Sequence, residues 1–207
     1  MKMVMKIFMH QVKKYFNLNK QTNKQMKTLI IHPLDNSTWF LYKIYENIED
    51  KTVITGNVTK NRVRELIAEH DRVIMMGHGS PNGLFSVGQF EQCDNGYIID
   101  RTMLKELYKK DNNVYIWCNA DIFVNYYLLE GYYTGMFISE VGEANYCGLP
   151  GMSQEIVDES NFGYTDILTK HINEDKFTLH KNVNEEYSKI AETNPVASYN
   201  YKRLYVA

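Results

Sequence analysis

The segment RVIMMGHG (residues 72–79) joins a mostly apolar run to a histidine that stands between two glycines. An apolar run of this length, followed by the turn residues SPNG, predicts a buried β-strand. Gly77 and Gly79 allow the backbone to turn sharply, and they leave the His78 imidazole uncovered. Ligands of parallel α/β sheets bind outside the carboxyl ends of the strands, so His78 is the first candidate functional residue.

Short apolar runs alternate with helical patterns along the rest of the chain. Further strands are predicted at residues 27–32, 52–57, 113–118 and 133–139, and helices at 37–48, 59–70, 101–110 and 120–130. Two short extended pieces follow the His78 turn, and most of the chain after residue 153 has a helical pattern. Strands that alternate with helices predict an α/β fold with a mainly parallel sheet and helices on both faces, which forms a single domain over residues 27–207.

Charge is distributed unevenly along the 207 residues. Residues 1–27 carry seven lysines and no acid, whereas the remainder has 16 basic and 25 acidic residues. We interpret residues 1–26 as a basic leader that is either disordered or a non-native start, because Met26 is a second possible initiator. The acidic remainder argues against nucleic-acid binding. No stretch reaches the roughly 18–20 apolar residues of a membrane span.

The three cysteines, Cys93, Cys118 and Cys147, are widely spaced and form no CxxC pair. An odd number of cysteines without such a pair gives no sign of a disulfide framework, a zinc knuckle or a dithiol redox motif. We therefore expect a reducing, cytoplasmic environment. Nothing in the sequence indicates an oligomeric state.

Polar side chains follow four of the predicted strands. They are His32 with Asp35, then His78, then Cys118, and finally Ser139 with Glu140. Because the carboxyl ends of parallel strands meet at one edge of a sheet, we expect these side chains to lie close together. An imidazole beside a thiol can accept the thiol proton and so produce a nucleophilic thiolate. The simpler alternative for Cys118 is a small, buried, apolar residue.

The order of these elements resembles the caspase-like cysteine peptidases, which include caspases, metacaspases, gingipains, separases and CHAT domains. Their signature is a strand that ends in His-Gly and a later strand that ends in the catalytic Cys. RVIMMGHG and NVYIWC resemble it, within residues 27–140. The resemblance implies a three-layer sandwich that hydrolyses a peptide or protein substrate without a cofactor. It assigns Cys118 as the nucleophile, His78 as the general base and acid, and the Gly79 amide as the oxyanion donor.

The resemblance also suggests how a substrate would be held, although Trp117 precedes Cys118 where the family often has a small residue. Substrates of the family frequently carry Arg, Lys or Asp before the cut bond. A basic side chain at that position would pair with a carboxylate. The candidate substrate-binding residues are Asp121, Ser139, Glu140, Glu143, His32 and Asp35.

Two other uses of the same residues stay open. GHGSP also resembles a metal-site segment of tetrapyrrole chelatases and extradiol dioxygenases, in which case His32 and Asp35 would join His78 in binding a metal such as iron, zinc or cobalt. Alternatively, the turn at residues 32–38 would bind a polar or nucleotide-like ligand with His78 and nearby tyrosines, as in a small-molecule sensor. A helix start capped by Ser37 is the simplest interpretation of that turn.

Overall fold

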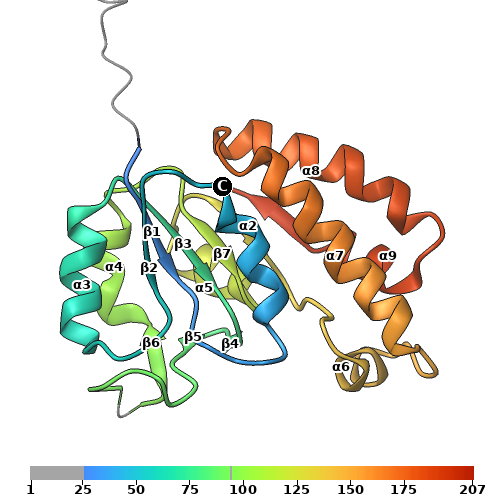
Figure 1. The fold of residues 1–207 in the computed structure, drawn as a ribbon, viewed down its shortest axis with the longest axis horizontal. Coiled ribbons are helices and arrows are strands. Elements are labelled where there is room, and N and C mark those ends of the chain that lie inside the picture. The colour runs from blue at the N-terminus through green and yellow to red at the C-terminus, as the bar shows by residue number, and fades with distance from the viewer. Residues whose placement is uncertain (1–25, 94) are drawn as a thin grey trace, which may run out of the picture.

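In a computed structural model of the chain, residues 26–93 and 95–207 are described, and the predicted basic leader lies outside them except for Met26. They form a six-stranded sheet in the order β2-β1-β3-β7-β8-β9 (Figure 1). Its strands are β1 (Thr28–Ile31), β2 (Lys51–Ile54), β3 (Arg72–Met76), β7 (Val114–Ile116), β8 (Tyr132–Thr134) and β9 (Leu204–Val206). The first five are parallel and β9 is antiparallel to β8, so the predicted mainly parallel α/β sheet is confirmed.

Helices cover both faces of this sheet (Figure 1). One layer contains α3 (Lys60–Glu69), η2 (Arg101–Met103), α4 (Leu104–Leu107) and α5 (Ala120–Tyr126). The other contains η1 (Trp39–Tyr42), α2 (Lys43–Glu46), α7 (Gln154–His171), α8 (Lys176–Ala191) and α9 (Pro195–Tyr201). A short helix, α6 (Val141–Tyr146), lies beyond the end of β8. None of the helices in the described ranges combines the length and the apolar character needed to span a membrane.

The central strands are apolar throughout because both of their faces are buried. In β1, Leu29 and Ile31 belong to the core beneath α3, whereas Ile30 belongs to the core beneath α2 and α7. Adjacent Val73 and Ile74 in β3 divide in the same way. Successive side chains of a strand point to opposite faces, so an uninterrupted apolar run supplies two cores at once.

A small antiparallel sheet follows β3 and contains β4 (Gly79–Ser80), β5 (Gly83–Phe85) and β6 (Tyr97–Ile99). Gly79 packs directly on the buried Trp117 ring, since a Cβ at this position would lie 2.2 Å from the ring Cδ1 atom. Gly77 has a φ of +139°, which side chains with a Cβ rarely adopt. The two glycines around His78 are thus required by the fold itself.

Two of the predicted elements differ from the structure. The predicted strand at 133–139 ends at Thr134, because the backbone N–H and C=O of Ile138 bond instead to the side chain of Asn200, at 2.7 and 2.9 Å. The predicted helix at 37–48 consists of η1 and the short α2. The helical pattern after residue 153 is confirmed for α7 to α9, but the terminal strand β9 was not predicted.

Candidate active site

His78 and Cys118 leave neighbouring strands at the same level of the sheet. β3 and β7 are adjacent and parallel, and the last residues paired between them are Met76 and Ile116. His78 and Cys118 each follow that pair by two positions, and both line one small cavity of about 20 Å³. A space of this size holds about one water molecule. The structure therefore brings together the two residues that the sequence selected.

The His78 imidazole is hydrogen-bonded to the turn that follows β1. Its Nε2 lies 2.7 Å from the Ser37 hydroxyl and 3.5 Å from the Asp35 carboxylate. The Ser37 hydroxyl also donates to Asp35 Oδ1 at 2.5 Å, and the Ser37 amide donates to the same oxygen at 2.9 Å. These bonds, chiefly those from Ser37, lower the pKa of the Asp35 carboxyl below its ordinary value.

The Cys118 thiol is held on the other side of the cavity. Its single S–H has two acceptors within reach, the Phe137 carbonyl at 3.4 Å and Glu143 Oε1 at 3.7 Å, while no hydrogen bond links the sulfur to His78. Burial, and next the negative charge of Glu143, raise the pKa of the thiol to about 12. In this conformation the sulfur is therefore a neutral thiol.

Glu143 organises the loop between β8 and α6. Its Oε2 accepts hydrogen bonds from the Ser139 amide at 2.7 Å, the Ser139 hydroxyl at 3.0 Å and the Glu140 amide at 3.2 Å. Its Oε1 receives the Cys118 thiol. Glu143 thus contacts the candidate nucleophile and shapes the loop, and its carboxylate is already occupied by these donors.

A second cavity, of about 160 Å³, lies beside the first. Phe40 and Ser139 line both, and Ser37, the hydrogen-bond partner of His78, lines the second. Its other lining residues are Asn36, Trp39, Glu140, Gln154, Asp158, Asn161 and Phe162. The cavity therefore has two carboxylates, aromatic walls and no lysine or arginine. That lining is suited to an organic cation.

The Gly79 amide is oriented away from its neighbour in the hairpin. Phe85 N donates to the His78 carbonyl, so His78 and Phe85 form a hydrogen-bonded pair in the antiparallel ladder. Gly79 and Leu84, the next pair, are then the non-bonded kind, whose N–H groups point outward from the two strands. An outward-pointing N–H immediately after His78 is a suitable donor to a developing oxyanion.

Two predicted substrate-binding residues lie apart from these cavities. His32 is 3 % exposed, and its nitrogens bond to the Tyr45 hydroxyl and the Thr38 carbonyl, both at 3.1 Å. Burial lowers the pKa of His32 to about 4, so the ring is neutral and holds the turn in place. Asp121, in the first turn of α5, lines neither cavity, and burial raises its pKa.

The same contacts bear on the alternative metal site. Both ring nitrogens of His32 are engaged, so His32 has no lone pair to offer beside His78. Within residues 26–93 and 95–207, no group of three or more His, Cys, Asp or Glu side chains is placed to hold a metal ion. The donor set that the GHGSP segment would require is therefore not assembled by the described part of the chain.

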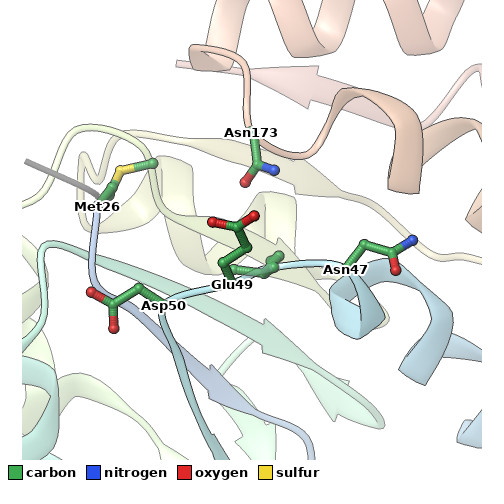
Figure 2. Close-up of a pocket in the computed structure, with 6 residues that line it drawn as sticks. Met26, Asn47, Glu49, Asp50 and Asn173 are labelled. Carbon is green, nitrogen blue, oxygen red and sulfur yellow. The ribbon is translucent and has the colours of Figure 1, made fainter. Parts of the chain in front are cut away.

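A larger cavity, of about 310 Å³, lies at the opposite edge of the sheet, next to the first residues of β1 and β2 (Figure 2). It is lined by Met26, Asn47, Ile48, Glu49, Asp50 and Asn173. These residues include no thiol, hydroxyl or imidazole. The candidate pair His78 and Cys118 lies instead at the carboxyl ends of the strands, where parallel sheets bind their ligands.

Sequence reasoning missed Ser37 as a partner of His78 and missed Asp158 altogether. Ser37 was expected to cap a helix, whereas its hydroxyl bonds to Asp35 and His78. The sequence could have indicated the contact between Ser37 and His78, because β1 and β3 are both predicted and the carboxyl ends of parallel strands meet at one edge of the sheet. Asp158 lies on α7, about 40 residues after Cys118, and no local pattern connects it to the site.

Comparison with known proteins adds no assignment: no protein-family model matches the chain, and no curated protein is significantly similar to it.

Proposed function

We propose that this protein is a cysteine-dependent hydrolase of peptide or related amide bonds, with Cys118 as nucleophile and His78 as general base and acid. The observation that supports the proposal is the register of β3 and β7, since His78 and Cys118 follow the same ladder pair by two positions and both line one cavity at the carboxyl edge of the sheet. A resemblance to the caspase-like peptidases, based on the His-Gly and strand-end Cys motifs, points to the same pair.

The reaction begins when His78 accepts the proton of the Cys118 thiol. The sulfur attacks the substrate carbonyl carbon and forms a C–S bond, while the carbonyl electron pair moves to the oxygen, to which the Gly79 N–H donates. The imidazolium then protonates the amide nitrogen as the C–N bond breaks. Water, deprotonated by His78, hydrolyses the thioester, and the proton returns to the sulfur.

The free protein holds the thiol in its neutral form, at Phe137 and Glu143. Proton transfer therefore requires the thiol to leave these partners. We place that change at substrate binding, when a substrate carbonyl enters the cavity between Cys118 and His78. The resting enzyme is then a poor nucleophile towards small electrophiles.

The cavity beside the reacting pair accommodates the residue that precedes the cut bond. Glu140 and Asp158 line it, and Gln154 Nε2 donates to Asp158 Oδ1 at 2.8 Å, which leaves Oδ2 for a ligand. Trp39 lines the same cavity and is 55 % exposed; one face of its ring stacks on Tyr42, and the other face is left for a cation. Arginine or lysine is the side chain that this lining favours.

The proposal is tested with a peptidyl acyloxymethyl ketone that carries arginine next to the ketone. Intact-mass and peptide mapping should locate one adduct on Cys118. Labelling should be lost in Cys118→Ala and in His78→Gln, and it should persist in Cys147→Ala, which removes another partly buried cysteine. Equal labelling of Cys118 in the His78→Gln variant would overturn the assignment of a Cys-His pair.

A further inference from the structure

Ser37 lies between a carboxylate and an imidazole, and it has one hydroxyl proton to give. The carboxylate of Asp35 is ionised near neutral pH, since its pKa lies below the ordinary value, and an ionised carboxylate only accepts hydrogen bonds. The 2.5 Å contact between Ser37 Oγ and Asp35 Oδ1 must therefore use the Ser37 proton. The hydroxyl has no second proton for His78.

The contact between Ser37 and His78 then has only one possible direction. With its proton given to Asp35, Ser37 Oγ can only accept at the 2.7 Å contact, so His78 Nε2 carries a hydrogen and donates it. A neutral imidazole has one N–H and one lone pair. The lone pair of His78 is consequently at Nδ1, and no other described residue forms a hydrogen bond to that nitrogen.

We propose that Asp35 and Ser37 are positioning residues that fix His78 as the Nε2–H tautomer and so make Nδ1 its proton acceptor. One part of this inference rests on the proposed function, namely that Nδ1 accepts the proton of Cys118. The tautomer itself follows from the hydrogen bonds alone. Because an imidazole with the wrong tautomer cannot accept the nucleophile's proton, such a pair of residues controls the rate through the imidazole.

The turn is built so that these bonds are preorganised. Thr38 N donates to the Asp35 carbonyl at 3.3 Å, and Ser37 N donates to Asp35 Oδ1, which closes a tight turn directly after β1. The buried His32 ring then holds the Thr38 carbonyl from beneath. Since β1 is the immediate neighbour of β3, this turn lies beside the His78 exit. Asp35 also places a negative charge 3.5 Å from Nε2, which stabilises the imidazolium formed during the reaction.

The direct test is a long-range ¹H–¹⁵N correlation spectrum of the full chain with ¹⁵N-labelled histidine, at a pH where His78 is neutral. The His78 signals are assigned by their absence in His78→Gln. Protonated and unprotonated ring nitrogens have well-separated ¹⁵N shifts. The wild type should show a single tautomer with Nε2 protonated, Ser37→Ala should show a mixture of the two, and Ser37→Thr, which keeps the hydroxyl, should restore the single form.

A matched control is Ser80→Ala. Ser80 lies two residues after His78 and its hydroxyl bonds to Tyr97 rather than to the imidazole. It should leave the His78 spectrum unchanged. With the peptidyl substrate, Ser37→Ala should lower kcat by at least about tenfold with little effect on KM, and Ser37→Thr should recover most of the loss.

The outcomes separate this inference from the proposed function. A wild-type His78 protonated on Nδ1, or one whose tautomer is the same in Ser37→Ala, would overturn the positioning role whatever the protein hydrolyses. Labelling of Ser37 itself by a fluorophosphonate would also overturn it, because Ser37 would then be the nucleophile. If the tautomer responds as expected while Cys118 is not labelled by the peptidyl ketone, the positioning role stands and the hydrolase proposal fails.

Discussion

Met76 and Ile116 are direct partners in the parallel ladder of β3 and β7, and this pairing brings His78 and Cys118 to the same level beyond the carboxyl ends of the two strands. A shift of the ladder by one residue would send one of the two side chains to the opposite face. The candidate pair is therefore specified by the register of two buried strands. The segments that follow β1 and β8 supply the hydrogen-bond partners of the two side chains.

Loss of the sulfur is expected to abolish turnover. Cys118→Ala should reduce kcat/KM for an arginyl peptide by at least about 10³-fold, because the acyl intermediate needs the sulfur. The two hydroxyls that line the same cavity, those of Thr38 and Ser139, donate instead to the Asp35 carbonyl and to Glu143. A fluorogenic peptide assay measures the effect, with thermal unfolding to check that the fold is kept. Turnover in Cys118→Ala that matches Cys147→Ala would rule out Cys118 as the nucleophile.

The raised pKa of Cys118 predicts slow alkylation of the free protein. In a Cys93→Ser, Cys147→Ser background, the rate with iodoacetamide should be very low at pH 7 and should climb with pH towards about 12. Glu143→Gln removes the neighbouring negative charge, so the thiol pKa should fall and alkylation at pH 9 should become faster. Mass spectrometry over time provides the rates. In the protein that keeps Glu143, an alkylation profile centred near pH 8.5 would contradict a buried, neutral thiol.

Buried His32 should make stability depend on pH. Its pKa is about 4 in the folded chain against 6.5 when exposed, so between these values the unfolded state binds the proton more strongly. Stability supplied by neutral His32 is thus complete above pH 6.5 and is lost as the pH falls towards 4, by at most about 3 kcal/mol.

Urea unfolding of the wild type and His32→Gln at pH 7, 5.5 and 4.5 tests this. The variant should be the less stable protein at pH 7, because it loses the bonds to Thr38 and Tyr45, and the difference between the two proteins should shrink as the pH falls. A difference that is constant across the series would mean that His32 titrates normally in the folded protein.

Specificity for a basic residue should depend on the second cavity, which is lined by Glu140 and Asp158. Glu140→Gln and Asp158→Asn should each lower kcat/KM for arginyl substrates by about tenfold, while substrates with a neutral residue at that position should be affected little. Glu155→Gln is the control, since Glu155 is an exposed acid in the first turn of the same helix as Asp158. Equal losses for arginyl and neutral substrates would show that the two carboxylates support the local structure and do not bind the basic side chain.

Gly79 should not tolerate a side chain. A Cβ would lie 2.2 Å from the Trp117 ring and 2.7 Å from the Gly83 carbonyl, so Gly79→Ala should destabilise the protein by about 3 kcal/mol. Gly142→Ala, where a Cβ would meet nothing within 4 Å, should have almost no effect. The midpoints of thermal unfolding of the two variants are compared with that of the wild type. Similar midpoints for both variants would refute the tight contact at Gly79.

The sequence alone was sufficient for the frame of the molecule. Strands buried on both faces must be apolar throughout, so β1, β3 and β7 could be located as uninterrupted runs between helical patterns. Their parallel arrangement placed His78 and Cys118 at one edge before any contact was known. Gly77 and Gly79 marked a turn, although the reason for Gly79 is the Trp117 ring, a contact across two strands that local sequence does not reveal.

Tertiary structure decided everything that depends on which distant side chains meet. The orientation of His78 is set by Ser37, 41 residues earlier, and the protonation state of Cys118 by burial and then by Glu143, 25 residues later. One wall of the cavity that contains Glu140 and Asp158 comes from α7. Asn200 shortens the strand predicted at 133–139, because its side chain bonds to the backbone of Ile138. Hydrogen bonds and desolvation act over a few ångströms in space, so their effects on tautomer and pKa appear only once the fold has brought these residues together.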